Sequence, residues 1–227
     1  MNISCTRLLV VLLLFTTFGS QAQDKTTVLH EHEFALSHEF TKNYSTNFAV
    51  SSRAFTYNND EIIYRMRQVQ LSHFSTLKLD LKQSIALGLM YRNRNLFEHS
   101  SNEIRLTQQF NRRSILKTLR FGHRFRSEQR FYDDFTAFRF RYRLALDIPL
   151  QGLKLDVDEM YFVIYNEALL TSSSSRKPEI GYRLSPSIGI QLSEKLRLEF
   201  GLELRLEALN IETSESLFFN TSVELRI

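Results

Sequence analysis

The chain has 227 residues, a formal net charge of +4 and 24% charged residues. That length suits one domain, and so small a net charge gives no indication of a nucleic-acid partner. Glycine (7) and proline (3) are too scarce for a collagen-like or disordered chain, whereas 19 Phe and 9 Tyr suit a surface that faces lipid.

The first 22 residues have the pattern of a secretory signal peptide. Arg7 supplies the positive charge, Leu8 to Phe18 form an apolar stretch too short to span a bilayer, and Ser20 to Ala22 end in a small-residue cleavage site. Cys5 is the only cysteine, so the mature chain is expected to lack disulfides and a thiol nucleophile. We predict a signal peptide over residues 1–22 and one domain over residues 23–227.

The mature part has no run of 18 or more apolar residues. This leaves two classes of protein, an exported soluble protein or an outer-membrane barrel. Its first half contains five segments in which polar and apolar residues alternate, as in strands. These are His30 to Phe40, Tyr44 to Tyr57, Glu61 to Leu79, a segment from Gln83, and Asn102 to Phe110.

The alternation slips by one residue within Glu61 to Leu79. Arg65 and Arg67 share a phase with Val69 and Leu71, so the register changes near Gln68. Either a β-bulge or a short extra turn that splits the segment into two strands explains this slip.

The stretch from Leu119 to Leu150 predicts a long hairpin with a polar break at Tyr132 to Asp134. One face of the hairpin is ionic, and the other face is aromatic and aliphatic. The ionic face carries Arg120, Arg124, Arg126, Glu128 and Arg130 in the first half and Arg139, Arg141, Arg143 and Asp147 in the second. A closed barrel in a bilayer suits both faces, because lipid covers the apolar side and the charges face a lumen.

Four further segments complete the chain: Met160 to Thr171, Ile180 to Leu192, Lys195 to Leu209, and a last strand that ends at Ile227. The total is eleven candidate strands, whereas bacterial single-chain barrels have an even number. Twelve result if Glu61 to Leu79 supplies two strands, and ten if the first segment is not a wall strand. We predict an all-β fold, a single antiparallel transmembrane β-barrel of 10–12 strands, and favour twelve.

Several short motifs, in this order and spacing, resemble a family of outer-membrane β-barrel proteins of Gram-negative bacteria, known as domain of unknown function 2490. They are Glu103 to Leu106 with Gln108-Gln109, Arg124 to Arg130, Arg139 to Leu144 with Ile148-Pro149-Leu150, Asn166-Glu167, and Gly181 to Leu184. The resemblance implies an outer-membrane barrel without an established activity. The chain differs from the family in lacking tryptophan.

The candidate functional residues are the charged side chains of the presumed inward phase, which form a lumen ionic network. They are Glu103, Arg105, Arg124, Arg126, Glu128, Arg130, Arg139, Arg141, Arg143, Glu167, Arg183, Arg197, Glu199, Glu203 and Arg205, with Glu224 in the same phase. One interpretation is a salt-bridged lumen with a structural role. The other is an arginine-rich lining for passage or binding of small anionic solutes.

Other functions find less support in the sequence. An exported soluble barrel carrying an apolar ligand stays open as an alternative, because alternation alone does not say which face is inside. An outer-membrane lipid-modifying enzyme could use His123 and Ser127, but four residues along a strand span roughly 13 Å, too far for a base and its nucleophile. His30 and His32 would share a face and could hold a metal.

We therefore predict no enzymatic activity, cofactor or metal. The expected partners are outer-membrane lipids and the barrel assembly machinery during insertion, with no nucleic acid. The oligomeric state is left open.

Overall fold

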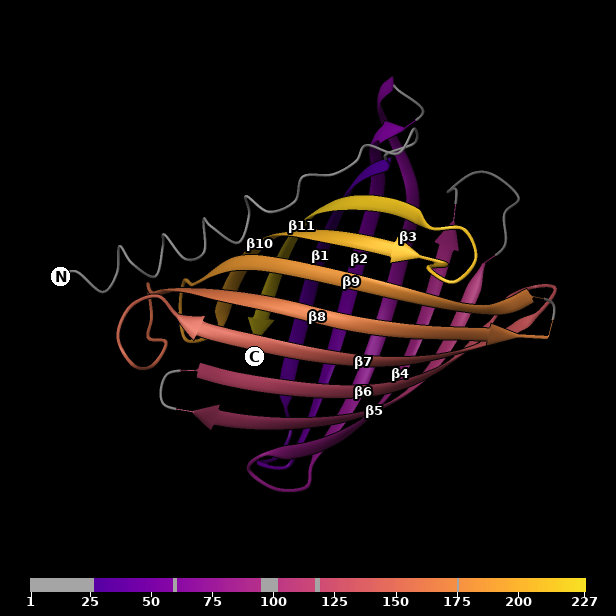
Figure 1. Cartoon of the computed structure of the whole chain (residues 1–227). Helices are drawn as coiled ribbons and strands as arrows, with labels where there is room; N and C mark the ends of the chain where they lie inside the picture. Colours follow the sequence, from indigo (N-terminus) through magenta and orange to yellow (C-terminus); the bar gives the residue numbers. More distant parts are fainter. Residues whose placement is uncertain (1–26, 59–60, 95–101, 117–118, 175) are drawn as a thin grey trace.

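The computed structural model describes residues 27–58, 61–94, 102–116, 119–174 and 176–227, so the predicted signal peptide lies outside it. Within these ranges the chain forms eleven strands that wrap into one closed barrel (Figure 1). The strands of the first half are β1 (Thr27–Glu39), β2 (Tyr44–Asn58), β3 (Glu61–Lys78), β4 (Gln83–Arg94), β5 (Glu103–Leu116) and β6 (Leu119–Phe131). The second half contains β7 (Thr136–Pro149), β8 (Met160–Ser173), β9 (Arg176–Gln191), β10 (Leu196–Glu207) and β11 (Ser214–Arg226).

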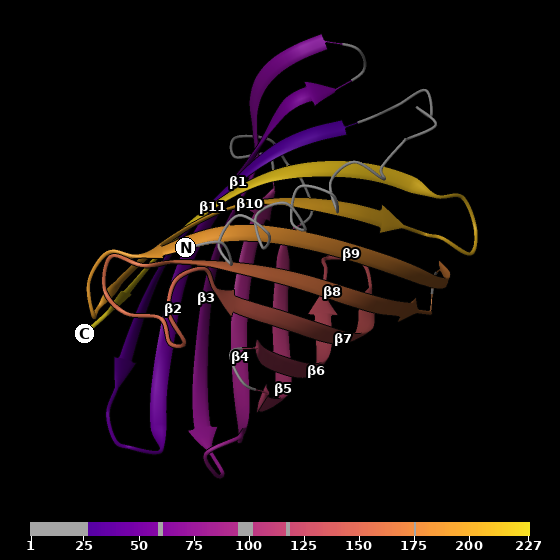
Figure 2. The same cartoon turned by 60° about the vertical axis from the view of Figure 1, so that its left-hand side comes forward.

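Each strand pairs antiparallel with its neighbours in sequence, but the barrel closes through a parallel pair. Strands β1 and β11 run side by side in the same direction, from Thr27↔Ser216 to Ser37↔Arg226 (Figure 2). With an odd number of strands in an up-and-down wall, the first and last strands must point the same way. The prediction of twelve strands and of a wholly antiparallel sheet is therefore wrong.

The irregular segment from Glu61 to Leu79 explains why the number of strands is odd. In the β2–β3 ladder Arg53 pairs with Gln68 and Ala54 pairs with Met66, so Arg67 is an extra residue on β3. This is the geometry of a β-bulge, which lets a strand absorb one residue without breaking. The structure thus confirms the bulge, and β3 is one strand rather than two.

The wall separates apolar from charged side chains. In β10, Phe200 is 56% exposed while Glu203 and Arg205 are 7% and 8% exposed. The same division recurs around the barrel, where large exposed side chains are aliphatic or aromatic and buried ones include Glu103, Glu128 and several arginines. The soluble-carrier alternative required apolar residues inside, and the structure has the opposite orientation.

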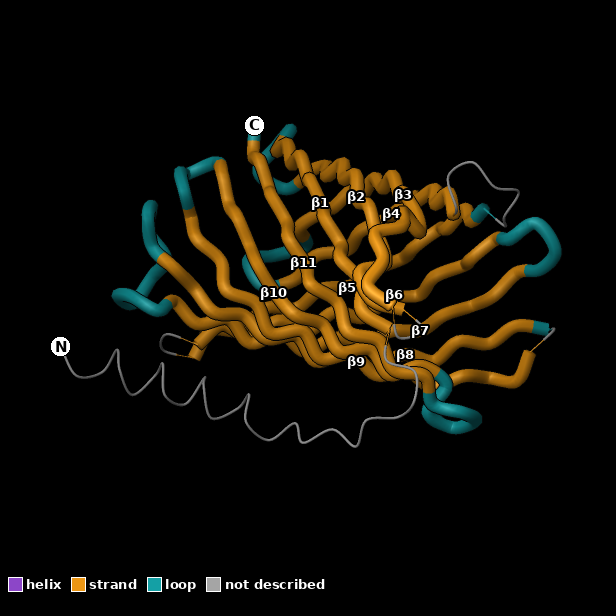
Figure 3. Tube along the Cα trace, turned by 90° about the horizontal axis from the view of Figure 1, so that it is seen from above, coloured by secondary structure: helices purple, strands orange, loops and turns teal. Residues whose placement is uncertain are grey.

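Turns and loops lie at the two ends of the wall, outside its span (Figure 3). At one end β2, β4, β6, β8 and β10 finish, and at the other end β11 brings the chain to Ile227. No helix among the described residues is long and apolar enough to cross a membrane.

Candidate functional site

The charged residues of the inward phase lie on neighbouring strands from β5 to β10. They converge because alternate residues of each strand point to the same face of the sheet. The structure joins many of them into two ion-paired networks, which we call the belt, and leaves others with neutral partners.

The first network of the belt centres on Glu103, whose side chain is fully buried. Its carboxylate accepts hydrogen bonds from Arg105 (Nη2 to Oε1, 2.6 Å), Arg130 (Nε to Oε1, 2.8 Å) and Arg92 (Nη1 to Oε2, 2.9 Å). Arg92 also donates to Gln70 on β3 at 3.0 Å. One carboxylate therefore ties together guanidinium groups from β4, β5 and β6.

The network continues through Glu128 and Arg141 to the next strands. Arg105 lies 3.5 Å from Glu128, and Arg141 donates to Glu128 at 2.9 Å and to Glu167 at 2.5 Å. Arg143 donates to the second oxygen of Glu167 at 2.9 Å. Ion pairs with several charge-assisted hydrogen bonds satisfy both charges, as burial requires.

The second network of the belt spans β9, β10, β1 and β2. Arg205 pairs with Glu203 in its own strand and with Glu31 across the closing strands at 3.1 Å. Glu31 also accepts from Arg53 at 2.7 Å, and Ser185 donates to Glu203 at 2.8 Å. This network therefore crosses the seam where the barrel closes.

Strand β11 contributes an aromatic ring to the second network. The guanidinium carbons of Arg205 and Arg53 lie 3.6 Å and 4.8 Å from the ring centroid of Phe218, which is buried. Stacking on a ring face stabilises a cation without supplying a negative charge. With Phe218 and Gln70 included, all eleven strands contribute to the belt.

The sequence analysis did not single out Arg92, Glu31, Arg53 or Phe218. The first three share the inward phase of their strands, so alternation could have identified them. No such signal identifies Phe218. In a sequence of this kind aromatic residues are expected to face outward, so an inward aromatic residue looks like a shift in register.

Five predicted residues make hydrogen bonds to neutral partners, and one of them, Arg126, also lies 3.7 Å from the carboxylate of Glu128. Arg124 donates to Asn111 at 3.3 Å, Arg126 to Gln109 at 2.9 Å and Arg197 to Gln191 at 2.5 Å. Glu199 accepts from the Tyr161 hydroxyl, and Arg139 donates from Nε to the Thr171 hydroxyl at 2.8 Å. Arg183 lies 3.8 Å from Glu207, a longer ion pair than those of the belt.

A cavity of about 490 Å³ opens at the end of the barrel where β2, β4, β6, β8 and β10 finish, and we call it the vestibule. Of the described residues that line it, eleven are arginine, one is lysine and two are glutamate. The charged members are Arg53, Arg67, Arg92, Arg94, Arg105, Arg130, Arg139, Arg141, Arg176, Lys177, Glu179, Arg183, Arg205 and Glu207.

The belt forms part of the lining of this cavity, and its arginines reach the cavity whereas, among the described residues, its carboxylates do not. Its arginines at positions 53, 92, 105, 130, 141 and 205 line the vestibule, whereas the described lining includes none of its carboxylates. The belt carboxylates offset the charge of these six arginines, so the positive potential comes chiefly from the lining cations outside the belt, and low-dielectric walls intensify it. The vestibule is therefore a ready environment for negative charge.

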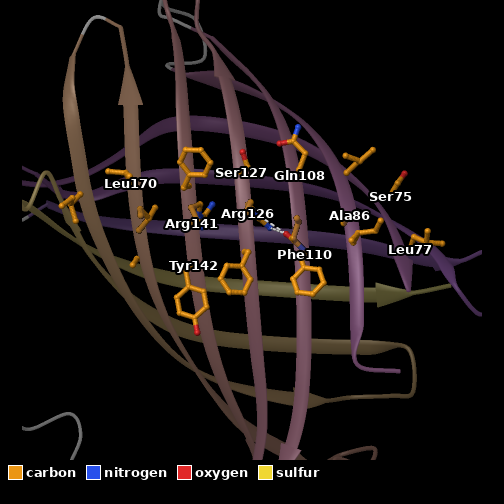
Figure 4. A pocket seen from close by; sticks show the side chains of 18 of the residues that line it. Ser75, Leu77, Ala86, Gln108, Phe110, Arg126, Ser127, Arg141, Tyr142 and Leu170 are labelled. Atoms are coloured by element: carbon orange, nitrogen blue, oxygen red, sulfur yellow. Dashed lines mark hydrogen bonds between the residues drawn. The ribbon is translucent and has the colours of Figure 1, made fainter. Parts of the chain in front are cut away.

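A second cavity, of about 1100 Å³, lies along the wall between β2 and β9 and is mostly apolar. Figure 4 shows Phe110 of β5, Tyr142 of β7 and Leu170 of β8 along this groove, with Gln108 of β5 and Ser127 of β6 among them. The imidazole of His123 is hydrogen-bonded to the Tyr142 hydroxyl at 2.9 Å. Strand β6 keeps an unbroken register from His123 to Ser127. The two side chains therefore share a face of β6 but stay four residues apart.

The two N-terminal histidines stack with ring centroids 6.0 Å apart. The His30 ring also forms a 2.7 Å hydrogen bond with the Thr56 hydroxyl. In the described ranges no group of three or more His, Cys, Asp or Glu side chains is arranged to hold a metal ion.

Fold and site together define a class: closed β-barrel proteins with an ion-paired interior, an apolar outer wall and a basic vestibule. The sequence profile of the family described as "Protein of unknown function (DUF2490)" matches residues 32–212, so the chain belongs to this family. No curated protein matches it.

Among solved structures, the siderophore receptor PirA from Pseudomonas aeruginosa is similar, with a TM-score of 0.31 and 15% sequence identity. The similarity covers 80% of this chain and 34% of the receptor, so the chain spans about a third of the receptor's length.

Proposed function

We propose that the chain is an outer-membrane β-barrel protein, exported by its signal peptide, that binds small anionic solutes in the vestibule. The observation that carries the solute class is the lining of the vestibule, in which eleven arginines and one lysine stand beside two carboxylates among the described residues. Six of these arginines are also paired with belt carboxylates outside the lining, so the cations beyond the belt supply most of the excess positive charge. Arginine presents several donors in a planar fork that matches carboxylate and phosphate oxygens. The proposed role is binding, without enzymatic activity.

The outer wall supports insertion into a bilayer. Phe34, Phe48, Leu89, Phe140 and Phe200, from five different strands, are each between 50% and 56% exposed. Strands of 12 to 18 residues exceed the about 9 to 11 tilted residues that cross a bilayer. Lipids would cover this wall, and the barrel assembly machinery would insert it.

The belt favours binding over free passage. Side chains from every strand converge on it, and its ion pairs hold long arginine and glutamate side chains across the interior. An open anion channel needs a lining with weak, mobile contacts, so that ions enter and leave rapidly. We therefore place the solute at the vestibule, above the belt.

Two measurements test this function. Extraction of membranes with alkaline buffer should leave the protein in the pellet, and detergent should release it; release without detergent would contradict membrane insertion. In planar bilayers the purified barrel should give no steady anion-selective current. Such a current would show that solutes pass through the belt.

Binding is tested by isothermal titration calorimetry on the detergent-purified barrel, with inorganic phosphate and pyrophosphate as anionic probes and glucose as the neutral control. We expect heat only from the anions, decreasing as sodium chloride is raised, since salt screens charge. If neither anion binds at low salt, the proposed solute class is wrong.

A further inference from the structure

Three arginines of the vestibule form no hydrogen bond or close ion pair with the belt carboxylates among the described residues. Arg139 directs its Nε to the neutral Thr171 hydroxyl at 2.8 Å, and Arg67 lies over the ring of Phe55, 5.2 Å from its centroid. Arg183 has a buried Nε without a hydrogen-bond partner among the described residues. The Thr171 hydroxyl and the Phe55 ring are neutral, so they position Arg139 and Arg67 without supplying a negative charge. The close ion pair of Arg183 is the 3.8 Å contact with Glu207.

The three arginines belong to three different strands, β7, β3 and β9, and line the same cavity as Glu207. Glu207, at the end of β10, interacts electrostatically with Arg183, Arg139, Arg205 and Arg67. Its shortest ion pair, to Arg183, is 3.8 Å, and its side chain is 57% exposed. Glu207 is thus a loosely held internal anion in front of several cations.

Aromatic rings support further cations at the rim of the vestibule. Arg94 lies over Tyr132, 5.7 Å from its centroid, and Arg176 lies 5.2 Å from the centroid of Phe135; Arg130 of the belt also stacks on Tyr132, at 5.3 Å. A guanidinium stacked on a ring loses less conformational freedom when it binds an anion. The rim is therefore pre-organised around the same cavity.

We infer that the vestibule selects polyanions, solutes that carry two or more clustered oxyanion groups such as a chain of phosphates. Arg67, Arg139 and Arg183 bind the separate anionic groups, and Glu207 is the internal counter-ion that the ligand displaces. A monoanion satisfies one guanidinium and leaves the others facing each other. This inference rests on the proposed anion-binding function and names its substrate class.

Size and location agree with such a ligand. A volume of about 490 Å³ lies within the range of small-molecule sites, roughly 300 to 1,000 Å³. The cavity is inside the ring of strands rather than on the apolar outer wall, so a water-soluble polyanion suits it better than a lipid headgroup.

The test compares tripolyphosphate with inorganic phosphate by calorimetry on the full barrel in detergent. We expect tripolyphosphate to bind wild type at least about tenfold more tightly than phosphate, since each additional charge-assisted contact adds affinity. The double variant R139Q/R183Q should lose at least about tenfold in tripolyphosphate affinity. Its matched control is R120Q, because Arg120 pairs with Asp147 at the opposite end of the barrel.

A separate variant tests the role of Glu207 as the internal counter-ion, and it changes an exposed side chain rather than a buried one. E207Q removes a half-exposed carboxylate, so it should raise tripolyphosphate affinity about two- to fivefold, the range of a partly screened ion pair. E39Q is the control, because Glu39 pairs with Lys78 at the opposite end and should leave affinity unchanged. A mere structural role for Glu207 would leave affinity unchanged or reduce it.

The outcomes distinguish polyanion selection from the proposed anion-binding function. Equal affinity for phosphate and tripolyphosphate, or weaker binding by E207Q, would overturn polyanion selection while leaving anion binding in place. If neither probe binds to a folded barrel, the proposed function fails as well. Circular dichroism of each variant checks folding before titration.

Discussion

Single carboxylates hold the interior of this barrel together. Glu103 has no exposed surface and accepts bonds from three guanidinium groups, so its removal would leave several buried cations without their shared partner. Breaking a buried ion pair by removing one partner costs more than the pair itself contributes.

We therefore expect Glu103→Ala to lower the free energy of unfolding by about 3 to 5 kcal/mol. Glu39→Ala is the matched control, because its ion pair with Lys78 is 67% exposed on the carboxylate side and should change stability little. Urea unfolding in lipid vesicles, followed by fluorescence of the tyrosines, measures both. Equal stability of the two variants would contradict a structural role for the first network.

Gly201 is a second position where one residue decides the packing. A Cβ at Gly201 would lie 2.2 Å from the Ser187 hydroxyl and 2.9 Å from the backbone oxygen of Pro186. At Gly122 the nearest atom would be the Cβ of Ala145, at 3.4 Å. We expect Gly201→Ala to destabilise the barrel by about 1 to 3 kcal/mol through overpacking, and Gly122→Ala to be tolerated. The same urea unfolding compares them, and a neutral Gly201→Ala would disprove the close contact.

At the scale of elements, Pro186 illustrates how the wall tolerates a residue that cannot donate. It lies within β9 and pairs with Ile164 of β8, although proline within a sheet is usually confined to an edge strand or a bulge. On the other side, the β9–β10 ladder omits the positions between Ser187 and Leu184. The missing donor thus coincides with a gap in the ladder, which limits its cost.

The parallel β1–β11 pair is the element-scale feature most open to test. His32 and Thr221 are register partners, and a pair of adjacent strands lies within the reach of a disulfide. We expect the variant His32→Cys/Thr221→Cys to form an intramolecular disulfide upon oxidation, detected as a shift in non-reducing electrophoresis. The control His32→Cys/Ser214→Cys places the second cysteine seven residues away and should not cross-link. Cross-linking in the control alone would mean a different closure.

For the whole molecule, the central question is which solvent covers the outer wall. Phe200 is half-exposed on the outer wall. Replacing it with arginine would not affect stability if water covered the wall, but would destabilise a barrel whose wall faces lipid. We expect Phe200→Arg to destabilise the vesicle-inserted barrel by about 2 to 4 kcal/mol. Leu153→Arg, at an exposed loop position, is the control and should be neutral. An equally stable Phe200→Arg would argue against membrane insertion.

Much of this architecture was predictable because alternation is a local property of a strand. The eleven segments recognised in the sequence correspond to the eleven strands, and the slip near Gln68 marked the bulge at Arg67. The expected number of twelve was wrong because it relied on a rule for bacterial barrels as a class. The ends of individual strands also differed: the predicted Asn102 to Phe110 extends to Leu116, because hairpin pairing with β6 continues beyond the polar residues.

The sequence by itself determined that this protein has strands with one ionic and one apolar face, since the alternation of polar and apolar residues is a property of consecutive residues. Only the tertiary structure decided which face lies inside, how the barrel closes and which charges meet. Glu31 and Arg205 are 174 residues apart, and they pair only because β1 and β10 both flank β11. Partners so distant in sequence depend on strand order and register, which no local pattern encodes.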